Sequence, residues 1–202
     1  MMINPIYFGA EPIVQVNLQE DYKKDLEYIK TLSFQTKNDG LHITEEDNIL
    51  ELPSLSNLKS IILKAFKEYQ DKILEVENDF YISQSWATIN RKTSYHGRHH
   101  HPNCLFSLVY YLQADDTGLN FMIKQSALQN SFNFHYKIKN HNYHNSTSWK
   151  VPVTTGDMMI FPGHLEHWSS PNENDEDRII LGANFFIKGE IGTKEDYSRI
   201  SI

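Results

Sequence analysis

The chain has 202 residues, enough for one domain with an apolar core. Charged residues make up 22% and aromatic residues 12% of the sequence, which excludes a disordered chain. The formal net charge of -7, without any dense cluster of lysine and arginine, argues against nucleic acid as a partner.

Cysteine usage and the absence of long apolar runs predict where the protein works. Cys104 is the single cysteine, which excludes an internal disulfide framework and favours a reducing compartment. The N-terminus lacks the basic and apolar regions of a signal peptide, and no apolar run approaches the ~20 residues of a membrane span. We therefore expect a cytoplasmic protein without membrane contact, and the oligomeric state stays open, a homodimer included.

Helical patterns dominate residues 1–79, which we expect to form an N-terminal support. Asn17 is the expected N-cap of a first helix over Leu18–Leu32. A second helix is predicted over Asn57–Val76, where apolar residues recur three and four positions apart. The stretch between them, residues 33–54, is polar and predicts an irregular connection.

From residue 80 to residue 187 the pattern changes to the alternation of β-strands. Within Phe80–Arg91, strict alternation places Ile82 and Trp86 on one face and Ala87 on the other. Two helices followed by many short strands indicate an α+β fold, a β-sandwich or jelly roll with the helices packed outside. The other predicted strands are Ile13–Val16, Leu105–Leu112, Leu119–Ile123, Val151–Val153, Asp157–Phe161 and Ile179–Ile187.

Two polar segments lie outside this alternation. Residues 125–148 are rich in Asn and Ser and contain His135, His141 and His144, so we expect a hairpin or lid that contacts substrate. Residues 188–202 predict a C-terminal tail on the outside. No internal repeat or linker divides the sequence, and a single domain is therefore predicted.

The histidines place the chemistry of the protein in its second half, because nine of the ten follow residue 95. On an extended strand His99 and His101 point to the same side, and His100 points away. Two early imidazoles and a late one, with coordination positions left open, form the facial arrangement of non-haem Fe(II) oxygenases. His167 and His164 are both candidates for the late ligand.

Arg178 is the candidate for binding a carboxylate, because its planar guanidinium matches the two carboxylate oxygens. Alternation places Arg178 on one strand face with Gly182 and Asn184, and the glycine would let a ligand approach closely. Tyr111, Asn90 and Asn184 are further candidates for the same ligand. Tyr111 could instead be a core aromatic, and Asn90 could be an amide bonded to backbone.

Several motifs together resemble a known family. The combination resembles the 2-oxoglutarate/Fe(II)-dependent oxygenases, and more narrowly a group from bacteria and marine phages that is distantly related to prolyl hydroxylases. The resemblance covers about residues 80–187. Its motifs are His99-x-His101-Pro102-Asn103, Phe106-Ser-Leu-Val-Tyr-Tyr-Leu112, Gly118-x-x-Phe121, Pro152-x-x-x-Gly156-Asp157-x-x-x-Phe161-Pro162, His167 and Arg178.

The resemblance implies a double-stranded β-helix of the jelly-roll, cupin-like kind, with Fe(II) held by His99, His101 and His167. Arg178 would bind 2-oxoglutarate with help from Tyr111. The implied reaction consumes 2-oxoglutarate and O2, releases succinate and CO2, and hydroxylates an unidentified substrate. The wider superfamily usually has Asp or Glu where His101 stands, so this ligand set carries one negative charge fewer. A phage protein of this kind would act in the host cytoplasm.

Two functions of other classes stay open at this point. A cupin-like metalloenzyme that does not use 2-oxoglutarate suits an iron site of three histidines, although Arg178 argues against it. A non-catalytic binding module on the same fold is the second, because a fold does not determine a function.

Overall fold

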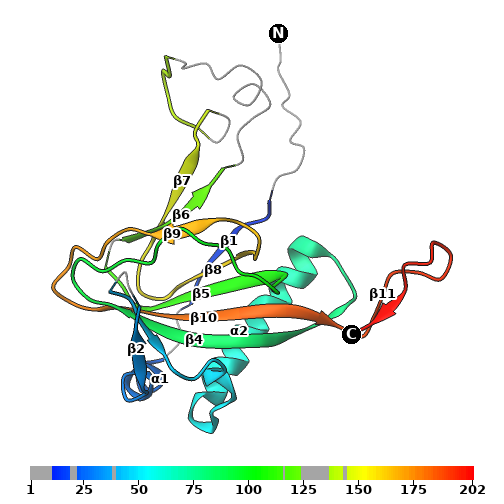
Figure 1. The fold of residues 1–202 in the computed structure, drawn as a ribbon, viewed down its shortest axis with the longest axis horizontal. Helices are drawn as coiled ribbons and strands as arrows, with labels where there is room; N and C mark the ends of the chain where they lie inside the picture. The colour runs from blue at the N-terminus through cyan, green and yellow to red at the C-terminus, as the bar shows by residue number, and fades with distance from the viewer. Residues whose placement is uncertain (1–10, 19–21, 38–39, 116, 124–136, 143–144) are drawn as a thin grey trace.

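Antiparallel sheets with helices on one side make up the protein in a computed structural model (Figure 1). Among the residues that the structure describes, no helix has the length and apolar character to cross a membrane. The described residues are 11–18, 22–37, 40–115, 117–123, 137–142 and 145–202.

The larger sheet has seven strands, and every neighbouring pair is antiparallel. Five of its strands lie where the sequence predicted strands. The other two lie in residues 33–54, where we expected an irregular connection, and with three residues each they are too short to show a period of two. In sheet order the strands are β1 Val14–Asn17, β8 Asp157–Pro162, β5 Phe106–Gln113, β10 Arg178–Lys188, β4 Asp79–Asn90, β3 His42–Thr44 and β2 Phe34–Thr36.

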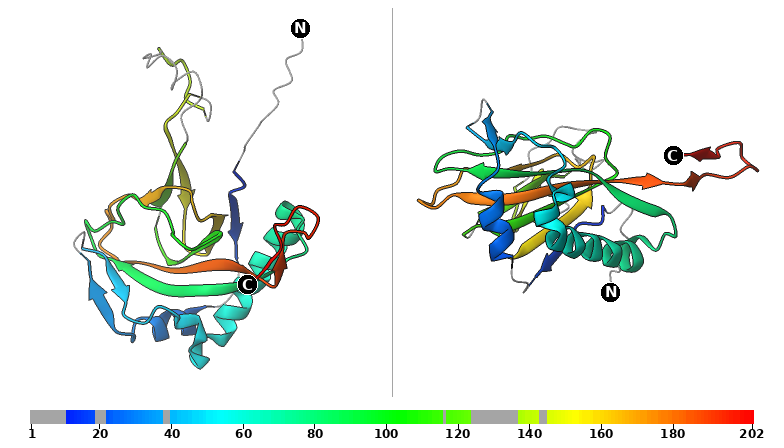
Figure 2. Two further views of the ribbon diagram at one scale, coloured as in Figure 1. Left: turned by 45° about the vertical axis from the view of Figure 1, so that its right-hand side comes forward. Right: turned by 90° about the horizontal axis from the view of Figure 1, so that it is seen from below.

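A smaller sheet of three strands lies over one face of the larger one (Figure 2). β6 (Thr117–Met122) is its central strand, between β7 (Ser148–Val153) and β9 (His167–Ser169). β6 begins at Thr117, two residues before the strand that was predicted over Leu119–Ile123. An apolar cluster that includes Val109, Tyr111, Met159, Leu119 and Phe121 fills the space between the two sheets.

The helices cover the opposite face of the larger sheet, as the sequence predicted (Figure 2). α2 (Ser56–Tyr69) continues as a π-helical turn over Gln70–Leu74 and packs its buried face on β10, where Phe66 stacks on Phe185 at 3.8 Å. Two 3-10 turns precede α2, at Ile49–Glu51 and Pro53–Leu55.

α1 is shorter than predicted and spans Lys23–Ile29. Asn17 ends β1 instead of capping this helix, because its side-chain amide donates to the Asp157 carboxylate at 2.9 Å. That bond holds the edge strand β1 against the start of β8. Asn is a residue type that favours helix N-caps, but here it joins two strands.

A β-bulge in β4 changes which side chains share a face. Asn184 pairs with Gln84, and the next residue of β10 pairs with Ile82, so Ser83 is an extra residue on β4. Ile82 therefore packs with Ala87 in the helix-side core, and our prediction that it shares a face with Trp86 was wrong. Beyond the bulge the alternation holds.

The last residues form a small hairpin that projects from the body of the molecule (Figure 1). β11 (Glu190–Ile191) pairs with β12 (Ile200–Ser201). Most side chains there are exposed, in keeping with the predicted outer tail. The predicted lid, residues 125–148, lies largely outside the described residues, and so do His135 and His144.

Candidate metal and carboxylate site

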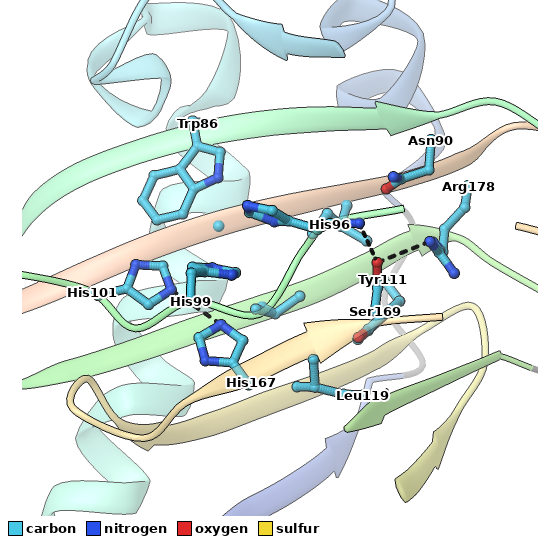
Figure 3. Close-up of a pocket in the computed structure, with 13 residues that line it drawn as sticks. Trp86, Asn90, His96, His99, His101, Tyr111, Leu119, His167, Ser169 and Arg178 are labelled. Carbon is cyan, nitrogen blue, oxygen red and sulfur yellow. Dashed lines mark hydrogen bonds between the residues drawn. The ribbon is translucent and has the colours of Figure 1, made fainter. Parts of the chain in front are cut away.

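A cavity opens between the two sheets, on the face of the larger sheet that lies away from the helices (Figure 3). Its walls combine imidazoles, apolar side chains and a few polar groups. The lining residues are Trp86, Asn90, His96, His99, His101, Val109, Tyr111, Leu119, His167, Ser169, Arg178, Ile180 and Gly182.

Three histidines come together in this cavity from two segments of the chain. His99 and His101 lie on the extended loop between β4 and β5, and His167 begins β9. The backbones of His99 and His167 exchange two hydrogen bonds, of 3.0 and 2.8 Å, which fix the loop beside the strand. One nitrogen from each of the three rings lies within 4.8 Å of the other two. His100 is exposed, as the spacing predicted.

Backbone carbonyls set the tautomers of two of these rings. Nδ1 of His99 lies 2.8 Å from the carbonyl oxygen of Gly97, and Nδ1 of His167 lies 2.8 Å from that of Leu165. A carbonyl oxygen only accepts, so both Nδ1 atoms carry the proton and both Nε2 atoms keep a lone pair. Nε2 of His101 lies 3.2 Å from Nε2 of His167. The donor set therefore fits a divalent transition metal.

Burial keeps two of the imidazoles neutral. Burial and the charge of a protonated His99 together lower the pKa of His101 to about 3. Burial and the same neighbour lower the pKa of His167 to about 2. The neutral imidazole is the form that binds metal ions, so these rings need not lose a proton at neutral pH.

His164, the alternative to His167, lies outside the cluster. Its side chain is exposed, and its Nε2 lies 3.0 Å from a carboxylate oxygen of Glu11. The structure thus brings His167, and not His164, next to His99 and His101.

Trp86 forms the wall above the histidines. Its indole stacks on the ring of His101, with centroids 5.5 Å apart. On the neighbouring strand Gly182 leaves room for it, since a Cβ there would lie 2.5 Å from the indole ring. We expected a ligand to approach Gly182 closely. The group that lies against this glycine is instead the Trp86 indole.

Arg178 lies at the other end of the cavity and is buried. Its guanidinium donates to Thr117 Oγ1 at 2.7 Å, to Ser169 Oγ at 3.1 Å and to the Ser170 carbonyl at 2.9 Å. A guanidinium has five N–H groups, so these contacts leave two, on Nε and Nη1, without an acceptor among the residues that the structure describes. The contacts hold a cation at the cavity wall.

Two further groups at this end add hydrogen-bond donors. Asn90 pairs with Arg178 across β4 and β10, and its buried Nδ2 has no hydrogen-bond partner in the described part of the chain. The Tyr111 phenol is buried, and burial raises its pKa, an effect that Arg178 opposes and Asp157 reinforces. The phenol therefore keeps its proton at neutral pH. An acceptor such as a carboxylate would satisfy these donors.

Asn184, which we expected at this site, does not line the cavity. Its side chain accepts from Ser107 at 3.1 Å and donates to Gln84 at 3.3 Å within the larger sheet. Sequence reasoning missed His96 and Ser169, both of which line the cavity. The only signal in the sequence is their closeness to the predicted metal ligands. His96 lies three residues before His99, and Ser169 lies two residues after His167.

Comparison with known proteins agrees with this chemistry. The family model described as "Putative 2OG-Fe(II) oxygenase" matches residues 84–184, which span the cavity-lining strands from β4 to β10. A comparison with curated proteins gives no significant match.

Several solved structures share the fold at low sequence identity. A prolyl-4-hydroxylase from Pseudomonas putida superposes with a TM-score of 0.59 and 14% identity, over 89% of this chain and 94% of that one. HygX from Streptomyces hygroscopicus, solved with nickel and 2-oxoglutarate, gives 0.60 and 9%, over 86% and 82%. The epimerase SnoN from nogalamycin biosynthesis gives 0.63 and 13%, over 87% and 76%.

Proposed function

We propose that this chain, which belongs to the family of 2OG-Fe(II) oxygenases, is a 2-oxoglutarate- and Fe(II)-dependent dioxygenase that hydroxylates a substrate C–H bond. The observation that carries the proposal is the division of one cavity into two chemically distinct ends. Three imidazole nitrogens converge at one end. A buried arginine lies at the other, beside an Asn90 amide that has no hydrogen-bond partner among the described residues.

The metal end is assigned to His99, His101 and His167. Bound Fe(II) would supply the activation of O2 that drives oxidation of 2-oxoglutarate to succinate and CO2. Three neutral ligands leave the full charge of the ion uncompensated, and the dianionic cosubstrate would offset it. The backbone carbonyls of Gly97 and Leu165 orient two of the rings, as outer hydrogen bonds usually do at metal sites.

The cosubstrate end is assigned to Arg178, with Tyr111 and Asn90 as further donors. A carboxylate accepts hydrogen bonds at both oxygens and donates none. These residues present N–H and O–H groups to the cavity, and the Asn90 amide has no hydrogen-bond partner among the residues that the structure describes. Burial in a poorly solvated pocket strengthens the attraction between the guanidinium and this anion. The apolar walls, which include Val109 and Ile180, suit the methylene carbons of 2-oxoglutarate.

The fold assignment that goes with this function is a double-stranded β-helix. After β5 the chain passes to the small sheet for β6 and β7, returns to the large sheet for β8, and alternates again through β9 and β10. We assign residues 80–187 to this catalytic core and residues 1–79 to its support, within one domain.

Hydroxylation is the outcome that we favour, because the structural relatives include a prolyl-4-hydroxylase. Another relative is an epimerase, so proteins of this fold catalyse more than one reaction. The product decides between them, because hydroxylation adds 16 mass units to the substrate and epimerisation adds none.

Succinate formation tests the proposal without knowledge of the substrate. Without its second substrate, the protein should still convert 2-oxoglutarate slowly. We therefore expect succinate when Fe(II), 2-oxoglutarate and O2 are all present. Omission of any one should abolish it, and Arg178→Met should reduce it sharply. Binding of Ni(II) without any binding of 2-oxoglutarate would instead favour a cupin-like metalloenzyme, and binding of neither would favour a non-catalytic module.

A further inference from the structure

The hydroxyl of Ser169 joins the two ends of the cavity. Its Oγ accepts one hydrogen bond from the backbone N–H of His96 at 2.8 Å and another from Nη2 of Arg178 at 3.1 Å (Figure 3). A serine oxygen has two lone pairs, and these contacts use both. One atom thus ties the buried guanidinium to the segment that leads into the metal-binding histidines.

The segment that Ser169 holds is the one that presents His99 and His101. The backbone N–H of Ser169 donates to the His96 carbonyl at 3.1 Å, and three residues further on His99 pairs with His167. The loop therefore lies along β9 like an extra strand. The Ser169 hydroxyl adds a side-chain link to this backbone pairing, and the same hydroxyl also reaches Arg178.

We propose that Ser169 is a positioning residue that couples the state of Arg178 to the geometry of the metal-binding loop. This inference rests on the proposed function only in taking His99, His101 and His167 as metal ligands. When the guanidinium donates to Ser169, the hydroxyl oxygen is fixed where it can accept from His96. When the guanidinium is removed, the hydroxyl is free to rotate away and the loop loses one anchor.

The consequence is that the arginine end supports metal binding without touching the metal. Linkage is reciprocal, so a ligand that alters the contact between Arg178 and Ser169 changes metal affinity, and the metal changes affinity for that ligand. A purely structural role would give a different result, because two unconnected contacts each contribute independently and their losses add.

A double-mutant cycle separates the two cases, with Ni(II) alone as the probe and no 2-oxoglutarate present. The variants are Ser169→Ala, Arg178→Met and the double variant, each in the full chain. We expect Ser169→Ala to weaken Ni(II) binding by about tenfold, the lower end of the usual effect of residues that orient ligands. Arg178→Met should weaken it severalfold in the wild-type background and add almost nothing to Ser169→Ala. Additive losses, or no loss in either single variant, would overturn the coupling.

A second measurement reads the loop directly and needs no metal. Amide hydrogen exchange over residues 94–101 should quicken in Ser169→Ala and in Arg178→Met, without a further increase in the double variant. Ser169→Thr keeps the hydroxyl oxygen and should retain wild-type protection. Arg178→Ala takes the place of Arg178→Met if thermal unfolding shows that the latter does not fold. Arg178→Lys still offers donors to Ser169 and should keep protection near that of the wild type.

The two measurements distinguish failure of this inference from failure of the proposed function. If the wild-type chain does not bind Ni(II), the proposed function fails, and hydrogen exchange still tests the link. If Ni(II) binds but exchange over the loop responds to Ser169 and Arg178 independently, the proposed function stands and the coupling is wrong.

Discussion

The Nε2 atoms of His101 and His167 face each other at 3.2 Å, while Nδ1 of His167 lies 2.8 Å from the Leu165 carbonyl. The carbonyl fixes the His167 proton on Nδ1, so its Nε2 is an acceptor. Without a metal, a proton on Nε2 of His101 can be donated to Nε2 of His167. A metal ion bound to both nitrogens would take the place of that proton. His99 supplies the third nitrogen of the same group.

The first prediction concerns the identity of the late ligand. The wild type should bind one Ni(II) ion per chain. His167→Ala removes one of the three converging nitrogens, so Ni(II) affinity should fall by at least about a hundredfold, the upper end of the effect of losing an outer partner of a ligand. His164→Ala is the matched control, because that ring is exposed and contacts Glu11 outside the cluster. Calorimetric titration measures both. Loss of binding in His164→Ala, with His167→Ala unaffected, would reverse the assignment.

The second prediction concerns the cosubstrate end. Arg178→Lys keeps a positive charge but loses the planar set of N–H groups, so 2-oxoglutarate should bind at least about tenfold more weakly. Ni(II) affinity should change much less, because lysine still offers donors to Ser169. Titration of 2-oxoglutarate into the Ni(II)-loaded protein measures the change. Arg98→Lys is the control, since its side chain is exposed and lies 3.7 Å from Glu166.

Equal affinity for 2-oxoglutarate in wild type and Arg178→Lys would contradict the assignment of this pocket. It would leave the histidine cluster intact as a metal site and remove the main argument for the cosubstrate.

Long helices and strands of the fold were predictable because apolar side chains recur along them at the spacing of a helix or a strand. α2 shows apolar residues on one face, and β4, β5 and β10 are long enough for a period of two. The misassignment of Ile82 came from a single inserted residue, Ser83, which local alternation cannot reveal. β9 escaped prediction because three residues beside a proline-containing turn show no period.

The site was predictable to the extent that spacing implies direction. His99 and His101 share a side because they are two residues apart, and the structure brings them to His167. The contacts of Ser169 were not predictable, since they join segments 73 and 9 residues apart. Asn184 was expected in the cavity from its parity with Arg178, but its amide is used by Ser107 and Gln84 instead.

The third prediction concerns stability and pH. The Asp157 carboxylate accepts from Asn17 at 2.9 Å and from the Thr154 N–H at 2.7 Å. Burial alone would raise the pKa of Asp157, but these hydrogen bonds outweigh it and the pKa lies below its usual value. Such a group stabilises the fold above its unfolded pKa of about 3.9, and the contribution disappears as pH falls through the folded pKa.

Asp157→Asn should therefore lower the free energy of unfolding at pH 7 by about 1–3 kcal/mol, the range for hydrogen bonds to a charged group. The gap between wild type and variant should narrow as the pH falls below about 4. Urea denaturation at several pH values measures it. Asp175→Asn is the control, because that carboxylate is exposed and pairs with Lys92 in solvent, where ion pairs contribute little. If the difference in the free energy of unfolding between wild type and Asp157→Asn grew as the pH fell, the prediction that the ionised carboxylate is stabilising would be wrong.

The fourth prediction concerns the packing of Trp86 on Gly182. In Gly182→Ala the new Cβ would lie 2.5 Å from the rigid indole ring, so the ring or the strand must move. We expect a loss of about 1–3 kcal/mol in the free energy of unfolding, as for other overpacked positions. Ni(II) affinity should fall as well, because the displaced indole stacks on the ring of His101.

Gly118→Ala is the matched control for this change, since it also lies in a strand and the atoms nearest to its Cβ would all belong to the flexible, exposed Lys150 side chain, which can move aside. Thermal unfolding and Ni(II) titration of the two variants measure stability and metal binding separately. Reduced stability with unchanged Ni(II) affinity would mean that the indole moves without disturbing His101. Unchanged stability would mean that the sheet opens at no cost, contrary to the close packing of β4 on β10.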